Sequence, residues 1–240
     1  MSEQIQGEYQ RFNLIERLQH GILFVTFLLL AFSGWALKYP EMEQSRWWIG
    51  IWGGPKNAHT IHVVSGVIMV SDFAWHVLYM AYRILTGRMR FHRDTTIVPV
   101  PKDLTDAAQN FKYFLGLSRE KPKFGRYNYI HKFDYWAVFW GMGIIGLSGL
   151  FLAFPVQASH LFPKWTLEWI WEVLFIMHGD EALLAIVFIF FFHFYNEHLR
   201  FEKFPMSMAW LTGRISLQEM KHEHPLEYEI EYGKKEGGKE

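Results

Sequence analysis

The chain contains no cysteine among its 240 residues. This absence excludes disulfide bonds, zinc or iron–sulfur sites built on thiolates, and covalent attachment of a c-type haem through a C-x-x-C-H motif. A redox cofactor bound by this chain alone therefore has to be held by other side chains. The sequence offers 12 histidines, and these are the first candidates for metal ligands.

An excess of charge of either sign is also missing. Lys and Arg together number 24, as do Asp and Glu, and this balance argues against a nucleic-acid partner. What the sequence has in abundance is apolar surface. Half of the residues (50%) are hydrophobic and 18% are aromatic, including 22 Phe and 11 Trp. An aromatic share this high is unusual for a water-soluble protein and points to a membrane.

Four apolar stretches are close to the roughly 20 residues that a helix needs to cross a bilayer. They cover residues 14–37, 59–82, 133–154 and 175–199. Trp and Tyr residues gather near their ends, for example Trp35, Trp52 and Trp171, as in the aromatic belts of membrane proteins. The first stretch lacks the cleavage site of a signal peptide, so we interpret it as a retained span.

Basic residues indicate the orientation of these spans, since Lys and Arg are enriched in cytoplasmic loops. The loop 83–132 carries 11 of them and the tail 200–240 carries seven, against four in the two remaining connections. We therefore expect an all-α membrane protein, a four-transmembrane-helix bundle with both termini cytoplasmic, in a single domain of residues 1–240. We expect the charged tail after His224 to fray or to wrap a partner.

Histidines inside the spans fall at two matching depths. His62 and His178 lie toward the outer ends of the second and fourth spans, whereas His20 and His193 lie toward the inner ends of the first and fourth. Ionisable residues inside a bilayer are costly and usually functional. Two facing imidazoles at one depth can bind a haem b iron from both sides. The sequence therefore predicts two haems b, one held by an outer pair (His62 and His178) and one by an inner pair (His20 and His193).

Two further residues bear on the inner haem. His76 follows His62 by 14 residues on nearly the same helix face, so it could replace His20 opposite His193 or serve a third site. Both alternatives stay open on the sequence alone. Arg17 lies one turn before His20 and is a candidate partner for a haem propionate.

The motifs around these residues resemble those of a known family. The openings of the first and second spans, the segment before the third and the fourth span itself read "ERLQHG", "HVVSG", "GRYNYIHK" and "MHGDEALLA…HFYNEH". They are similar to the four-helix cytochrome b subunits of membrane-bound formate dehydrogenases, thiosulfate reductases and related b-type cytochromes, over nearly the whole chain. The resemblance implies the same haem ligands, with His62 and His178 at the outer haem and His20 and His193 at the inner haem.

The resemblance also implies a quinone site on the cytoplasmic side, beside the inner haem. This site would lie at the turn that contains Gly125, Tyr127 and Asn128. Asn128 can form a hydrogen bond with a quinone oxygen, and His131 and His198 are candidates to pass protons. The expected substrate is menaquinone or ubiquinone.

Some features depart from the formate dehydrogenase subunits. The spacing between His178 and His193 is one residue longer than we expect, which indicates a local π-bulge or a changed haem tilt. His131 stands where those subunits usually have Gln. The sequence motifs of the fourth span, together with His76, resemble more closely those of b-type cytochromes encoded beside multihaem cytochromes c. The partner at the outer face is therefore either an iron–sulfur subunit or a multihaem cytochrome c subunit.

Together these features predict a membrane-anchor cytochrome b subunit of a respiratory oxidoreductase complex in a bacterial or archaeal cytoplasmic (inner) membrane. Two haems b would carry electrons between the outer-face partner and the quinone site, with membrane lipid around the spans. The chain is then an electron-transfer subunit without a catalytic residue of its own. The alternative is a non-redox scaffold or transporter whose histidines line a metal or proton path, although such transporters usually show repeats and broken helices.

Overall fold

The structure of the chain, a computed structural model, describes residues 7–89, 92–163, 166, 169–199 and 206–236. The chain divides into two compact units. The first, here called the helical unit, is formed by Ile15–Met80 and Val138–Ser207. The second, here called the terminal unit, joins segments that are far apart in the sequence, namely Met1–Leu14, Ala81–Ala137 and Met208–Glu240.

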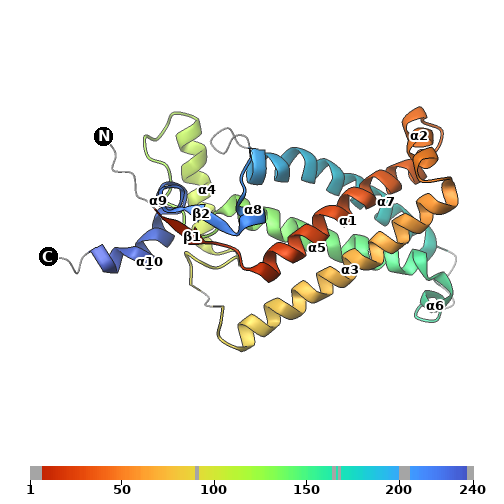
Figure 1. The fold of residues 1–240 in the computed structure, drawn as a ribbon, viewed down its shortest axis with the longest axis horizontal. Helices are drawn as coiled ribbons and strands as arrows, with labels where there is room; N and C mark the ends of the chain where they lie inside the picture. Colours follow the sequence, from red (N-terminus) through yellow and green to blue (C-terminus); the bar gives the residue numbers. More distant parts are fainter. Residues whose placement is uncertain (1–6, 90–91, 164–165, 167–168, 200–205, 237–240) are drawn as a thin grey trace. The chain divides into compact units, whose positions relative to one another are not determined.

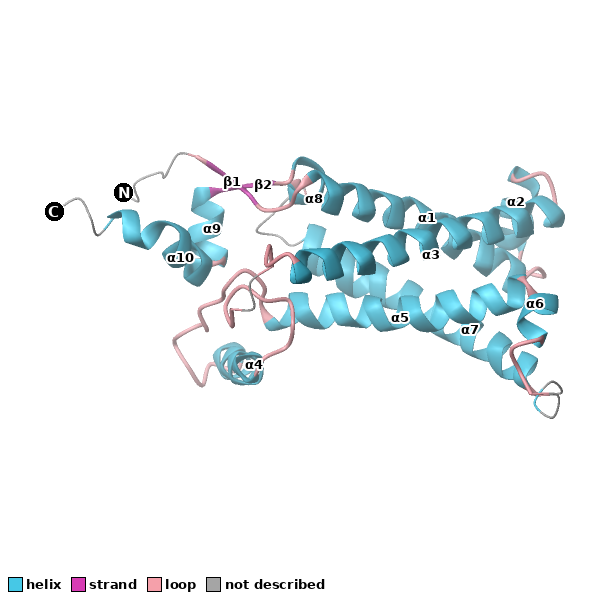
Figure 2. Ribbon diagram, turned by 90° about the horizontal axis from the view of Figure 1, so that it is seen from below, coloured by secondary structure: helices cyan, strands magenta, loops and turns pink. Residues whose placement is uncertain are grey.

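Four long helices supply most of the helical unit and run side by side (Figures 1 and 2). They are α1 (Leu14–Lys38), α3 (Pro55–Leu85), α5 (Tyr129–Ala153) and α7 (Ile170–Phe188), which continues as the π-helix η2 (Ile189–Leu199). All four are long and apolar enough to cross a membrane, so the predicted all-α bundle of four spans is confirmed. Three of them, α3, α5 and α7, begin four or five residues before the predicted stretches, because first turns with residues such as Lys56, Lys132 and Glu172 fall outside an apolar window.

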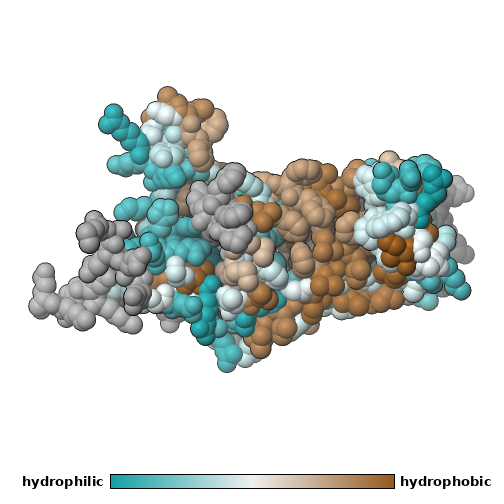
Figure 3. Space-filling view, turned by 45° about the horizontal axis from the view of Figure 1, so that its top comes forward, coloured by the Kyte–Doolittle hydropathy of each residue, from teal (hydrophilic) through white to brown (hydrophobic). Residues whose placement is uncertain are grey.

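The outward faces of these helices are apolar. Leu78, Leu184 and Phe191 are 70%, 60% and 79% exposed, although such side chains normally avoid water. Figure 3 shows hydrophobic side chains over much of the visible face of the long helices. An exposed apolar surface of this extent is typical of contact with lipid. The chain is therefore a multi-pass membrane protein.

Small side chains fill the spaces between the helices. Ser33 and Ala36 on α1 and Ser148 on α5 are at most 2% exposed. Small residues let helix backbones approach closely where lipid supplies no hydrophobic driving force. Gly146 on α5 illustrates the limit, because a Cβ atom there would lie 3.1 Å from Cγ2 of Val70 on α3. The close approach of α5 and α3 thus depends on this glycine.

The fourth helix changes its geometry half-way. Ile170–Phe188 is α-helical, whereas Ile189–Leu199 is a π-helix. Hydrogen bonds in a π-helix run between residues i and i+5, so residues five apart lie on one face. The π geometry that the sequence spacing indicated is therefore present, and it extends over 11 residues instead of one bulge. Its wider turns accommodate the extra residue between His178 and His193.

Two short helices follow α1 and α5 within the helical unit. They are α2 (Glu43–Ile51) and α6 (Pro155–Ser159). Trp48 of α2 stacks on Phe32 of α1, with ring centres 4.7 Å apart. Trp47, beside it, is 61% exposed. Exposed and stacked aromatic rings at a helix end are typical of a membrane interface.

The terminal unit is built on a pairing of the two chain ends. β1 (Glu8–Gln10) and β2 (Arg214–Ser216) form an antiparallel sheet, with Tyr9 opposite Ile215. Around β2 the chain forms α8 (Ala209–Thr212), α9 (Leu217–Glu223) and α10 (Pro225–Glu236) (Figure 2). Ile215, Met220 and Tyr228 form the core of this part and are at most 7% exposed. The prediction that the tail after His224 frays is wrong as far as Glu236, because α10 packs Tyr228 into this core.

The loop between α3 and α5 also belongs to the terminal unit and contains α4 (Pro101–Phe114). Asp103 caps α4 by accepting a hydrogen bond from the N–H of Val100 at 2.6 Å. The same carboxylate pairs with Nζ of Lys132 at 2.9 Å, and Lys132 is only 2% exposed. This buried ion pair ties the start of α4 to the start of α5, next to the predicted quinone turn.

Candidate cofactor sites

The structure brings the predicted outer pair together inside the helical unit. His62 on α3 and His178 on α7 have ring centres 6.1 Å apart and ring planes 85° apart. Since a metal–imidazole bond is about 2 Å long, two imidazoles on opposite sides of one iron have ring centres roughly 6 Å apart. The spacing of the outer pair therefore fits one iron held by both rings.

A cavity of about 450 Å³ lies beside the outer pair. Helices α1, α3, α5 and α7 all line it, mostly with apolar side chains and with the glycines Gly34, Gly66, Gly146 and Gly149. Its volume falls within the range of about 300–1,000 Å³ that is usual for ligand and cofactor sites. A flat macrocycle needs an apolar slot next to its ligands, and these residues provide one. They fit a haem.

Lys38, the last residue of α1, also lines this cavity. Its Nζ pairs with Oδ1 of Asp180 at 3.1 Å, and a Cβ atom at Gly179 would lie 2.8 Å from the same Nζ. A cation at the edge of an apolar slot can pair with a carboxylate of the cofactor. Hydropathy alone assigns Lys38 to a loop, so the sequence does not reveal this residue.

The inner pair also meets, and a third histidine joins it. His20 on α1 and His193 on η2 have ring centres 6.3 Å apart. The ring centre of His198 lies 5.8 Å from that of His20 and 5.3 Å from that of His193. One ring nitrogen of each residue lies within 4.8 Å of the others. The cluster thus offers three ligand atoms where the sequence predicts two.

The π-helix explains why His198 lies in this cluster. In an α-helix, a residue five positions after His193 would point about 140° away from it. The i to i+5 pattern of η2 instead places both histidines on one face. The sequence groups His198 with the quinone turn around Asn128, whereas the structure places it beside His20 and His193 in the helical unit.

His76 and Arg17 are the other residues predicted near the inner haem. Nδ1 of His76 is hydrogen-bonded to Oε1 of Gln19 at 3.1 Å, and Gln19 is only 4% exposed. Among the described residues, the converging nitrogens are those of His20, His193 and His198. This geometry favours His20 over His76, and the ligand assignment itself stays a prediction. Arg17 is half-buried on α1, one turn before His20.

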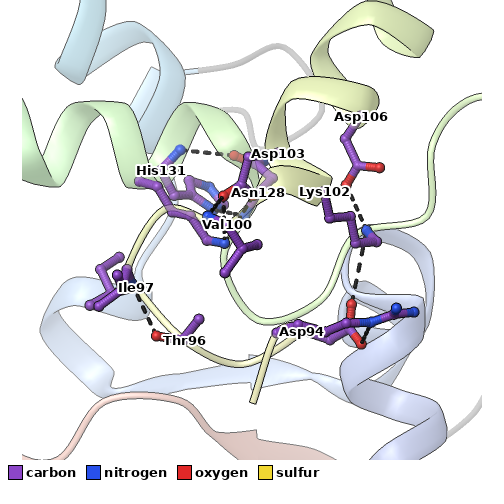
Figure 4. A network of polar contacts seen from close by, with 12 residues as sticks. Asp94, Thr96, Ile97, Val100, Lys102, Asp103, Asp106, Asn128 and His131 are labelled. Carbon is purple, nitrogen blue, oxygen red and sulfur yellow. Dashed lines mark hydrogen bonds and ion pairs between the residues drawn. The ribbon is translucent and has the colours of Figure 1, made fainter. Parts of the chain in front are cut away.

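Asn128 and His131 cap the start of α5 reciprocally (Figure 4). Oδ1 of Asn128 accepts a hydrogen bond from the N–H of His131 at 2.8 Å, and Nδ1 of His131 accepts one from the N–H of Asn128 at 3.3 Å. Both side chains are held as in a capping box. Because these bonds use acceptor atoms, the remaining donors are Nδ2 of Asn128 and the Nε2–H of His131.

Gly125 allows two parts of the terminal unit to approach closely. A Cβ atom at this position would overlap the carbonyl group of Asp94, which accepts a hydrogen bond from the N–H of Arg126 at 2.7 Å. The carbonyl oxygen of Gly125 accepts a hydrogen bond from Nδ1 of His224 at 2.8 Å. The predicted importance of Gly125 for the turn therefore has a steric cause, and no positive φ is involved.

Tyr127 lies beside a buried cluster of ions. Glu227, which is 2% exposed, pairs with Arg126 at 2.7 Å and with Arg11 at 3.2 Å. Tyr9 donates a hydrogen bond to the same carboxylate at 3.2 Å, and burial together with the charge of Glu227 raises the pKa of Tyr9 to about 12. Burial disfavours the charge of Arg126, but Tyr127 and Glu227 outweigh it and raise the pKa of the guanidinium. Arg126 is therefore a fixed positive charge within the turn.

Comparison with known families agrees with this geometry. A family model described as prokaryotic cytochrome b561 matches residues 11–196, which is well over half of the chain. The chain belongs to the prokaryotic cytochrome b561 family. This protein is thus a membrane cytochrome b of electron transport, and membership of the family implies haem b. The electron-transfer hypothesis is favoured over a non-redox scaffold or transporter.

Relatives of this cytochrome b561 protein include cytochrome subunits of formate dehydrogenase. The formate dehydrogenase cytochrome b556(fdo) subunit of Escherichia coli (strain K12) is 25% identical over 206 residues, which cover 86% of this chain and 81% of that subunit. Proteins of the same name from E. coli O6:H1 and O157:H7 match to the same extent. The predicted resemblance to formate dehydrogenase cytochrome b subunits is confirmed.

The structure of this cytochrome b561 protein places one further histidine near the quinone turn, and the sequence did not predict it there. His224 is 4% exposed, and its ring centre lies 6.0 Å from that of His131. Because its Nδ1–H donates to the carbonyl of Gly125, its Nε2 is a hydrogen-bond acceptor. His224 lies in a charged tail without hydrophobic periodicity, so the sequence carries no signal that it is buried near the turn.

Proposed function

We propose that this cytochrome b561 protein is the membrane-anchor subunit of a respiratory oxidoreductase complex, with two haems b each held by two histidines. The observation that carries the proposal is the presence of two histidine pairs in one four-helix unit, with ring centres 6.1 and 6.3 Å apart. Haem b supplies one-electron chemistry when it is bound. The partner at the outer face is an iron–sulfur subunit or a multihaem cytochrome c subunit.

The outer pair and the inner pair hold one haem each. Lys38 pairs with a propionate of the outer haem, since this cation lines the cavity beside the outer pair. Arg17 does the same for the inner haem from its position one turn before His20. His198 stays beside the inner pair as a group that can carry a proton.

Residues 1–240 form one integral-membrane cytochrome b domain in a bacterial or archaeal cytoplasmic membrane. The 11 basic residues of the loop 83–132 support a cytoplasmic position for that loop. The quinone turn lies within this loop and at the start of α5, so quinone exchanges its protons with the cytoplasm. The outer pair then faces the partner subunit.

The quinone turn supplies donors for a menaquinone or ubiquinone. Nδ2 of Asn128 donates a hydrogen bond to a quinone oxygen, while Oδ1 keeps its bond to the N–H of His131. The Nε2–H of His131 passes a proton, with the acceptor nitrogen of His224 close behind it. The close approach at Gly125 and the ion pair of Arg126 with Glu227 stabilise the conformation of the turn.

Haem counting tests this function. The protein purified from haem-replete cells should show a reduced-minus-oxidised α-band of haem b and about two haems per chain in a pyridine haemochrome assay. His62→Ala should remove one haem and His20→Ala the other, whereas His76→Ala should leave both. A colourless preparation, or full haem content after His62→Ala and His20→Ala, contradicts the proposal.

A further inference from the structure

Each histidine of the outer pair packs against a Ser–Gly dipeptide on a neighbouring helix, here called its seat. Ser33–Gly34 of α1 faces His62 of α3, and Ser148–Gly149 of α5 faces His178 of α7. In both places the serine contacts Nδ1 of the ring, and a Cβ atom added at the glycine would meet Cε1 next to it. The same two residue types thus surround two histidines that lie on different helices.

The serine hydroxyl in each seat acts as an acceptor toward the histidine. Oγ of Ser33 lies 2.5 Å from the carbonyl oxygen of Leu29, one turn earlier, and 2.9 Å from Nδ1 of His62. A carbonyl oxygen cannot donate, so the single hydroxyl proton goes to Leu29. The remaining lone pairs of Oγ then accept a hydrogen bond from the Nδ1–H of His62.

The seat of His178 has the same arrangement and adds an independent check. Oγ of Ser148 donates to the carbonyl oxygen of Ile144 at 2.7 Å and lies 3.2 Å from Nδ1 of His178. The same Nδ1 lies 3.1 Å from the carbonyl oxygen of Ile145, which can only accept. Nδ1 of His178 therefore carries the proton. In this tautomer Nε2 is unprotonated and has a lone pair for a metal.

The glycines give the rings room to take this orientation. A Cβ atom at Gly34 would lie 3.1 Å from Cε1 of His62, and one at Gly149 would lie 2.9 Å from Cε1 of His178. Contacts this short force a neighbour to move, and here the neighbour is a ring that is fixed by its own hydrogen bond. Ser33 and Ser148 are at most 2% exposed, so water does not compete for these bonds.

We propose that Ser33 and Ser148 are positioning residues that preset the outer pair for haem. Each holds its histidine in the Nδ1–H tautomer and directs Nε2 toward the iron. By accepting a hydrogen bond from Nδ1–H, each serine also makes the imidazole a stronger electron donor. A stronger donor stabilises ferric over ferrous iron, so both serines lower the midpoint potential of the outer haem. This inference rests on the proposed function, which assigns His62 and His178 as ligands.

The test measures the outer haem by itself. In a His20→Ala background, which retains only the outer haem, Ser33→Ala and Ser148→Ala are compared with Ser71→Ala by potentiometric titration and by electron paramagnetic resonance of the ferric haem. Ser71 is a suitable control because it is exposed, lies on α3 with His62 and donates only to its own helix, to Val67 at 2.7 Å.

Both alanine variants should keep the haem, shift its potential to more positive values and change its resonance spectrum. Loss of such a partner typically weakens metal binding about 10–100-fold. A tenfold larger loss for ferric than for ferrous iron corresponds to about 59 mV for one electron. Ser33→Thr, which keeps the hydroxyl, should restore the potential, and this separates the hydrogen bond from a general loss of packing.

The outcomes separate this inference from the proposed function. If His62→Ala removes the outer haem but Ser33→Ala and Ser148→Ala behave as Ser71→Ala does, the positioning role is overturned and the ligand assignment stands. If His62→Ala leaves the haem in place, the ligand assignment itself fails. A shift that Ser33→Thr reproduces in full also overturns the role of the hydroxyl.

Discussion

The buried carboxylate of Glu227 offers a sharp test of what holds the quinone turn. Glu227→Gln keeps the shape of the side chain and removes its charge, which leaves the guanidinium groups of Arg11 and Arg126 without their counter-ion. The guanidinium groups of Arg11 and Arg126 lie 3.2 and 2.7 Å from the carboxylate. Glu227 is 2% exposed and Arg11 is 7% exposed. Removing one partner of a buried ion pair costs about 3–5 kcal/mol.

The lower end of that range applies here, because the side chain of Arg126 is 20% exposed and can regain water. A cost of about 3 kcal/mol raises the population of locally opened states more than a hundredfold, since 1.4 kcal/mol is a factor of ten. Hydrogen exchange of the amides in β1, β2 and α10 should accelerate by this factor, because the carboxylate ties both chain ends to the turn.

The matched control is Glu229→Gln, which removes the same charge from an exposed position of the same helix. It should leave exchange unchanged within about twofold, as is usual for surface substitutions. The haem spectrum should be the same in both variants. If Glu227→Gln exchanges no faster than Glu229→Gln, the ion cluster does not hold the terminal unit together and the reasoning is refuted.

Three further predictions follow from single contacts. Gly149→Ala should lower the haem content and shift the spectrum of the outer haem, because its Cβ atom would lie 2.9 Å from the ring of His178. Gly143→Ala should do neither, because no atom lies within 4 Å of the added Cβ. Burial and the charge of Glu227 raise the pKa of Tyr9 to about 12, so Tyr9 should contribute stability that is present below pH 10 and lost as the pH rises toward 12. Tyr9→Phe should flatten this decrease of stability with pH in exchange experiments. Asn128→Asp keeps the cap but loses the Nδ2 donor, so quinol KM should rise about tenfold with unchanged haem content, and an unchanged KM would exclude Asn128 from the quinone site.

The four spans could be predicted from the sequence because lipid acts on each helix separately. A run of apolar residues has to be long enough for the bilayer, and this condition needs no knowledge of the neighbouring helices. The helix ends were less predictable, since Lys56 and Glu172 extend α3 and α7 into turns that lie outside an apolar window. Hydropathy describes the membrane part of a helix and not the whole helix.

The terminal unit could not be predicted in the same way. Its strands have three residues each, and Tyr9 pairs with Ile215 across nearly the whole length of the chain. Glu227 lies in a run of charged residues, where a carboxylate is normally exposed. It is buried because Arg11 and Arg126 meet it from two distant segments. Such contacts leave no periodic pattern in the sequence.

The histidine pairs were predictable to the extent that depth follows from residue number. The rise along a helix places His20 level with His193 and His62 level with His178, without any tertiary information. The direction in which a side chain points depends in addition on the helix type. The π-helix turns His198 toward the inner pair, and an α-helical reading of the sequence cannot show this.

The Ser–Gly seats show why a short motif gains meaning only from the facing helix. The spans contain three such dipeptides, Ser33–Gly34, Ser65–Gly66 and Ser148–Gly149. In the part of the chain that the structure describes, no hydrogen bond joins Ser65 to a histidine, and the nearest atom to a Cβ at Gly66 is a leucine carbon 3.8 Å away. Ser33 and Ser148 lie 29 and 30 residues before His62 and His178, and each contacts its histidine on a neighbouring helix. The two rings held in this way have centres 6.1 Å apart, which meets the condition for sharing a single iron.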